Sequence, residues 1–174
     1  NFPLNDPLGN HIHGFLHKRE HSIVSVDILE DRVVGKTEYT YDKNDEFFSV
    51  YPVSFKAEYT FTLSENGLLY EFTITNISDK QLPFGVCNHT SFNGPLTEDG
   101  DGLDMRLYLP IGEKWELSKT CIPTGEFLPR TNHDRQYLTG SLVPVLQDID
   151  NDVYFAEVGS MDDKPFYGAI ITDV

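Results

Sequence analysis

Residues 55–75 read Phe55-Lys56-Ala57-Glu58-Tyr59-Thr60-Phe61-Thr62-Leu63-Ser64-Glu65-Asn66-Gly67-Leu68-Leu69-Tyr70-Glu71-Phe72-Thr73-Ile74-Thr75. Apolar and polar side chains alternate from Phe55 to Leu63, which is the pattern of a half-buried β-strand. The sequence Glu65-Asn66-Gly67 then predicts a hairpin turn, because Asn-Gly accepts positive φ at low cost. Alternation resumes from Leu68 to Thr75. The stretch therefore predicts two antiparallel strands joined by a tight turn.

The chain on both sides of this hairpin also favours β-structure. Strand-like segments are expected at residues 23–29, 32–41, 82–86, 103–109, 113–117, 126–128, 153–158 and 166–172, with a turn at 123–125. No stretch has the periodicity of an amphipathic helix. Many short strands separated by turn residues are typical of a β-sandwich, so the predicted fold class is all-β.

Length and charge limit the function classes. A chain of 174 residues is long enough for one domain with a hydrophobic core, so we expect a single domain over residues 1–174. The formal net charge of −15 argues against a nucleic-acid partner and disfavours an anionic membrane surface. No apolar run approaches the length of a membrane span.

Two cysteines, Cys87 and Cys121, stand in no metal-ligand spacing. A single pair forms no disulfide framework, so a reducing, cytoplasmic compartment is the simpler expectation. The last residues, 170–174, read as the middle of a strand, and residue 1 starts within a loop. We therefore expect the chain to be the incomplete, central portion of a longer domain.

Histidines gather in two places. Residues 88–93 carry His89 between two asparagines, just after an apolar run and before Gly94-Pro95. Histidine changes charge near neutral pH, which suits proton transfer, although a lone histidine at a strand end is more often structural. Residues 11–21 hold four more histidines. If that segment is extended, His11 and His13 project to the same side and could chelate a metal.

Both clusters together resemble the aldose 1-epimerase (galactose mutarotase-like) family of the bacterial type. The similar motifs are Gly9-Asn10-His11-Ile12-His13-Gly14-Phe15, the hairpin that ends at Thr73-Ile74-Thr75-Asn76, Leu82-Pro83-Phe84-Gly85, Asn88-His89-Thr90-Ser91-Phe92-Asn93 and Ile122-Pro123-Thr124-Gly125-Glu126. Each motif alone is weak to moderate evidence. Their order and spacing over most of the chain make the resemblance fairly specific.

The resemblance implies a β-supersandwich with a carbohydrate cleft and no cofactor or metal. It also implies a reaction, the interconversion of α and β anomers of an aldohexose such as galactose or glucose. In that family the histidine of the second motif is the general acid that protonates the ring oxygen, which assigns this role to His89. His13 matches a histidine that binds sugar hydroxyls. The family's sugar-binding Asp best matches Asp152, with Asp150 as the rival.

Some features depart from the family pattern. The family's catalytic Glu lies C-terminal to anything here, and its N-terminal Arg precedes the first residue. Ser91 stands where a Tyr is common, and His21 stands where a Trp often follows. Three hypotheses therefore stay open: a mutarotase that takes its base from elsewhere, a non-catalytic carbohydrate-binding sandwich, and a metal-dependent β-barrel enzyme that uses His11 and His13.

Overall fold

A computed structural model of the chain describes residues 2–142 and 152–173. Within these ranges the strands pair antiparallel in four sheets, and the two helices are short 3₁₀ turns. The predicted all-β class is confirmed. The chain forms two compact units, unit 1 at residues 1–87 and unit 2 at residues 88–174. The expectation of a single domain over residues 1–174 stays a prediction.

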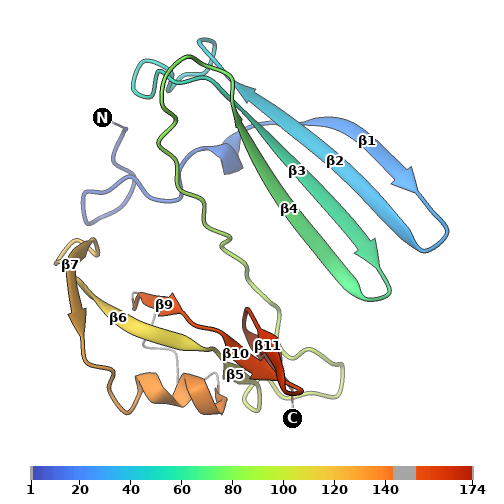
Figure 1. The fold of residues 1–174 in the computed structure, drawn as a ribbon, viewed down its shortest axis with the longest axis vertical. Helices are drawn as coiled ribbons and strands as arrows, with labels where there is room; N and C mark the ends of the chain where they lie inside the picture. The colour runs from blue at the N-terminus through green and yellow to red at the C-terminus, as the bar shows by residue number, and fades with distance from the viewer. Residues whose placement is uncertain (1, 143–151, 174) are drawn as a thin grey trace. The chain divides into compact units, whose positions relative to one another are not determined.

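Unit 1 is one sheet with the strand order β1-β2-β3-β4, drawn in blue to green in Figure 1. Its elements are the 3₁₀ helix η1 (Leu16–Lys18) and the strands β1 (Ser22–Ile28), β2 (Arg32–Tyr41), β3 (Phe55–Ser64) and β4 (Gly67–Asn76). Every residue of β3 is paired with β2 on one side and β4 on the other. The predicted hairpin is confirmed, with Gly67 at φ +122° directly after the turn.

The core of unit 1 lies on the face of the sheet that carries Phe55 and Ala57. Tyr41, Phe55 and Ala57 are 0%, 3% and 0% exposed, and the rings of Tyr41 and Phe55 stack with centroids 4.8 Å apart. Side chains that pack against them are Phe15, Leu16, Tyr39, Phe48, Tyr51, Tyr59, Phe72, Ile74 and Leu82. At the other end of the same face, Leu63 and Leu68 are 57% and 62% exposed. Burial is therefore concentrated at one end of the sheet.

Asp45 fixes the segment between β2 and β3. Its carboxylate accepts hydrogen bonds from Arg19 Nε (2.6 Å), Arg19 Nη2 (2.9 Å), the Tyr39 hydroxyl (2.6 Å) and the Phe47 backbone N–H (2.8 Å). Burial raises the pKa of Asp45, but the hydrogen bonds from Arg19, Tyr39 and Phe47 outweigh that effect and lower the pKa to about 2. The Asp45 side chain is only 2% exposed, so this ion pair is shielded from water.

Unit 2 contains shorter strands around a second small core. Its elements are β5 (Arg106–Tyr108), β6 (Ile111–Leu117), β7 (Pro123–Leu128), the 3₁₀ helix η2 (Asp134–Thr139), β8 (Ser141–Leu142), β9 (Tyr154–Ala156), β10 (Gly159–Met161), β11 (Lys164–Phe166) and β12 (Ile170–Thr172). They form the sheets β12-β5-β8, β7-β6-β9 and β10-β11. Ile111 and Tyr137 are buried, with Leu107, Leu109 and Tyr154 packed against them.

The expectation of a strand at residues 82–86 is wrong. Residues 81–93 form no helix or strand and are drawn as a plain trace after β4 (Figure 1), and all of them except Leu82 are exposed. Pro83 lacks the N–H that a strand must donate, and Gly85 weakens a strand by its backbone freedom. An apolar run also needs a neighbouring strand to pair with, which its own residues cannot supply.

Other boundaries also differ from expectation. Residues 123–125 belong to β7 instead of a turn, and the turn lies at residues 118–121, where Cys121 has φ +59° and its N–H donates to the Ser118 carbonyl. The strand expected at 103–109 is reduced to Arg106–Tyr108, and the segment at 166–172 is divided between β11 and β12. Gly168, at φ +149°, separates those two strands.

Replacement of Asp45 by Asn is expected to lower the free energy of unfolding by about 3 kcal/mol, because it leaves Arg19 without its buried partner. The folded-state pKa of Asp45 lies below its ordinary value of 3.8. Its ionisation therefore stabilises the wild type above about pH 4, and this contribution is lost as the pH falls from about 4 to 2. Urea unfolding of both proteins at several pH values measures the difference. If the wild type and Asp45→Asn lost the same free energy of unfolding as the pH falls from about 4 to 2, this explanation would be contradicted.

Candidate functional site

His89 lies in the exposed segment that opens unit 2. Residues 88–93 have no regular secondary structure, and each is exposed to solvent. The imidazole is therefore carried by a loop that a ligand can approach, instead of being packed in a core. Loops of this kind often hold binding and catalytic groups.

The backbone beyond this segment is fixed by two contacts. A Cβ atom built on Gly94 would lie 2.3 Å from Met105 Sδ, so the backbone passes close to that side chain. The Asp173 carboxylate accepts hydrogen bonds from the backbone N–H groups of Leu96 (3.0 Å) and Thr97 (3.3 Å). The loop that follows His89 is thus attached to the residue directly after β12.

His13 adopts a strained backbone conformation. Its φ is +65°, and the following Gly14 is at +58°. A residue with a side chain pays a steric cost there, although histidine is among the types found in this region more often than most. Strained residues gather at functional sites, which makes His13 a candidate functional residue. The side chain is exposed and lies against His17, with ring centroids 6.3 Å apart.

His11 has a different environment from His13. Its Nδ1 lies 2.7 Å from the Pro3 carbonyl oxygen, and its ring stacks on Phe2 at 4.9 Å. The condition for a chelating pair, an extended segment that directs His11 and His13 to the same side, is not met, because the positive φ of His13 breaks the extended path. Across residues 2–142 and 152–173, no three His, Cys, Asp or Glu side chains are grouped so that they could hold a metal.

Asp152 belongs to a polar network in unit 2. Its Oδ2 accepts hydrogen bonds from Lys114 Nζ (2.8 Å) and from the Tyr154 hydroxyl (3.0 Å). The same two donors also reach Oδ1 of Asp134, at 3.1 Å and 2.6 Å. Asp134 is 1% exposed, whereas the Asp152 side chain is 30% exposed. The rival residue, Asp150, lies outside the described residues.

In this network the ammonium group of Lys114 forms ion pairs with both Asp134 and Asp152. Burial raises the pKa of Asp134, but hydrogen bonds from Tyr154, Thr131 and Lys114 outweigh it and hold that pKa well below the usual range. Burial lowers the pKa of Lys114, but Asp152 and Asp134 outweigh this effect and raise it. The Tyr154 pKa is raised by burial and by its bonds to both carboxylates. Lys114 is therefore charged and Tyr154 is neutral at physiological pH.

The structure brings Asp152 together with residues that the sequence did not single out. Lys114, Asp134 and Tyr154 were missed, because an isolated lysine or tyrosine in a strand carries no motif. Asp134 had a weak signal in Thr131-x-x-Asp134, a capping-box spacing. His89 and Asp152 lie in unit 2, and His13 lies in unit 1.

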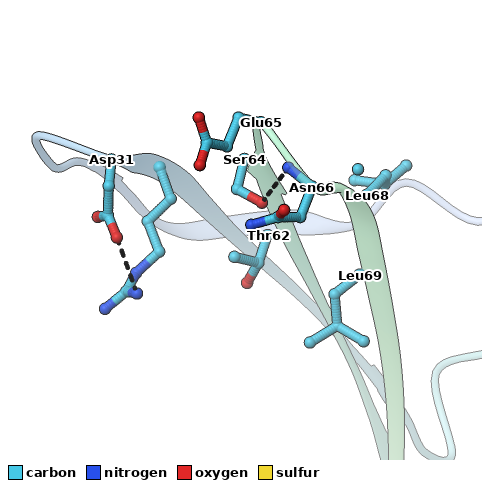
Figure 2. A pocket seen from close by; sticks show the side chains of 9 residues that line it. Asp31, Thr62, Ser64, Glu65, Asn66, Leu68 and Leu69 are labelled. Atoms are coloured by element: carbon cyan, nitrogen blue, oxygen red, sulfur yellow. Dashed lines mark hydrogen bonds and ion pairs between the residues drawn. The ribbon is translucent and has the colours of Figure 1, made fainter.

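A shallow hollow of about 410 Å³ lies at the turn end of the unit 1 sheet. It is lined by Asp31, Arg32, Thr62, Ser64, Glu65, Asn66, Gly67, Leu68 and Leu69 (Figure 2). The Arg32 guanidinium pairs with Asp31 at 3.4 Å, and both side chains are largely exposed. None of the three candidate residues lines this hollow.

The arrangement of strands matches a known architecture. A 1.80 Å crystal structure of a galactose mutarotase-like protein from Clostridium acetobutylicum superposes with a TM-score of 0.88 over 99% of this chain and 51% of that chain, at 24% sequence identity. The fold is therefore that of a galactose mutarotase-like β-sandwich, as predicted.

The sequence also identifies the family to which the chain belongs. The sequence model of aldose 1-epimerases matches residues 1–165, and the chain belongs to the aldose 1-epimerase family. Two curated relatives are the plasmid and chromosomal LacX proteins of Lactococcus lactis subsp. lactis, each 28% identical over 114 residues, which is 65% of this chain. The chain spans 36% of the length of each relative. In the described ranges, no helix is long and apolar enough to cross a membrane.

Replacement of His13 by Gly is expected to leave the free energy of unfolding unchanged or to raise it by up to about 1 kcal/mol, because glycine adopts positive φ without a steric cost. The matched control is His17→Gly in η1, which is expected to cost about 0.5 kcal/mol or more through backbone entropy. Urea unfolding compares the two variants with the wild type. A clear loss of stability in His13→Gly would show that the histidine serves the fold.

Proposed function

We propose that the protein is an aldose 1-epimerase that interconverts the α and β anomers of an aldohexose such as galactose or glucose. The observation that carries this proposal is the family match over residues 1–165. That range includes both histidine segments, residues 9–15 and 88–93. The exposure of His89 in a loop supports the proposal, since a sugar must be able to reach the acid.

In this proposal His89 is the general acid. Its imidazolium donates a proton to the ring oxygen of the sugar, while a carboxylate accepts the proton of the anomeric hydroxyl. The ring opens to the aldehyde, the C1–C2 bond rotates, and closure on the other face of the carbonyl yields the other anomer. Histidine suits this step, because both of its protonation states are populated near neutral pH.

His13 and Asp152 bind the sugar in this proposal. An imidazole can donate or accept a hydrogen bond, and a carboxylate accepts hydrogen bonds from hydroxyl groups. Both side chains have solvent-accessible surface. Asp152, which lies in the same unit as His89, would orient the sugar so that its ring oxygen faces His89. Their contribution is to binding, whereas that of His89 is to the chemical step.

A second candidate function is carbohydrate binding without catalysis. It is favoured by one structural observation: Lys114 and Tyr154 hold Asp152 in orientation, which suits sugar binding and does not itself require proton transfer. Without a base, a sandwich that keeps His13 and Asp152 would still bind a sugar. The two functions differ in whether the anomers equilibrate faster in the presence of the protein.

The proposed partner is a small neutral sugar, and the proposed role lies in carbohydrate metabolism in the cytoplasm. A reducing compartment suits the two cysteines, because Cys87 and Cys121 are both exposed and free. An acidic protein with a net charge of −15 suits an uncharged ligand better than a phosphorylated one.

The test is the rate of α-to-β interconversion of galactose and glucose, followed by polarimetry, for the complete product of the gene. The wild type is expected to accelerate interconversion, and His89→Ala is expected to lower kcat/KM by about 10²-fold to 10⁴-fold through loss of the acid. Circular dichroism should show that His89→Ala remains folded, because residues 88–93 are exposed.

The control is His133→Ala, which removes a histidine of the same unit that lies in no family motif. It should retain activity. Full activity in His89→Ala would refute the assignment of the acid. A wild type that binds sugar without accelerating interconversion would establish the binding protein instead.

A further inference from the structure

The Asp152 carboxylate is held through one of its two oxygens. Both hydrogen bonds, from Lys114 Nζ at 2.8 Å and from the Tyr154 hydroxyl at 3.0 Å, go to Oδ2. Among the described residues, Oδ1 has no such donor, and the side chain is 30% exposed. The carboxylate is thus fixed in orientation while one oxygen remains available as an acceptor.

The two donors lie on the same face as Asp152 because of strand pairing. Lys114 of β6 is directly opposite Tyr154 of β9. Asp152 lies two residues before Tyr154, so an extended chain directs both side chains to the same face. The backbone therefore determines that these three groups meet.

Lys114 is itself held by a buried carboxylate. Asp134 Oδ1 lies 3.1 Å from Lys114 Nζ, and Asp134 Oδ2 accepts a hydrogen bond from the Thr131 backbone N–H at 2.5 Å. The Asp134 N–H donates in return to Thr131 Oγ1 at 3.2 Å. This reciprocal pair of hydrogen bonds fixes Asp134 at the start of η2.

The network has one more carboxylate than cations. Asp134 and Asp152 share a single ammonium, and the Tyr154 hydroxyl has one proton for two acceptors, the closer being Asp134 at 2.6 Å. Asp152 therefore depends mainly on Lys114 and retains capacity for further donors. Sugar hydroxyls are donors of the required kind, and hydrogen bonds to a charged acceptor are stronger than neutral ones.

We infer that Lys114 is a positioning residue that orients Asp152 for a sugar hydroxyl, with Asp134 as the buried anchor of Lys114. The inference rests on the proposed role of Asp152 in sugar binding. Lys114 does not touch the sugar in this arrangement. Its effect passes through Asp152, and it should change sugar affinity far more than the rate of the chemical step.

The experiment is a double-mutant cycle on the complete gene product, with Lys114→Met, Asp152→Asn and the double variant. Calorimetry gives the galactose Kd, and polarimetry gives kcat and KM. Lys114→Met is expected to raise Kd and KM about 10-fold, as for the loss of a hydrogen bond to a charged group, with kcat nearly unchanged. In the Asp152→Asn background the same change should alter Kd less than about twofold, because its effect passes through Asp152.

Two further variants accompany the cycle, one as a milder change in the network and one as a matched lysine control. Lys114→Met leaves Asp134 buried without its cation, so Tyr154→Phe serves as a milder change that keeps the aromatic ring and is expected to raise Kd about threefold. Lys119→Met replaces an exposed lysine just beyond β6 and should leave Kd unchanged. Thermal unfolding of each variant identifies any loss of the fold.

The outcomes separate the inference from the proposed function. A wild type that neither binds galactose nor accelerates its interconversion overturns the proposed function, and the inference with it. A wild type that binds galactose, with Lys114→Met and Asp152→Asn effects that multiply in the double variant, overturns the inference alone. A lower kcat at unchanged KM in folded Lys114→Met would also overturn it.

Discussion

The central constraint on unit 1 is the pairing of β3 with strands on both sides. Because every residue from Phe55 to Ser64 has two partners, a shift of one residue would move its entire apolar set to the opposite face. The register therefore decides which side chains reach the core around Tyr41 and which face solvent. Unit 2 obeys the same rule in smaller sheets. There the pairing of Lys114 with Tyr154 places a cation and a hydroxyl on the face of the sheet that also carries Asp152.

Sequence reasoning succeeded where structure depends on local pattern. The hairpin at residues 55–75 has alternation and an Asn-Gly turn, and both are properties of neighbouring residues. It failed at residues 82–86, because an apolar run becomes a strand only when another strand pairs with it. It also missed the positive φ of His13, since nothing in the letters distinguishes an extended histidine from a left-handed one. The network around Lys114 could not be predicted, because Asp134 and Asp152 meet it only through tertiary folding.

Family membership and local geometry contribute different parts of the functional argument. The match to aldose 1-epimerases over residues 1–165 shows the family, whereas the reaction and the roles of His89, His13 and Asp152 are proposals. The geometry adds what the match cannot: an exposed loop for His89, a strained backbone at His13 and a carboxylate at residue 152 that is oriented by its neighbours. Strain costs free energy, and strained residues gather at functional sites.

The central claim is that His89 and Asp152, which both belong to unit 2, bind one sugar molecule. A galactose titration followed by NMR, with the imidazole signal of His89 and the backbone amide of Asp152 assigned, tests this claim most directly. The account predicts that both signals shift along a single binding curve with one Kd. A shift of only one of the two signals, or separate Kd values for the two residues, would contradict a common site.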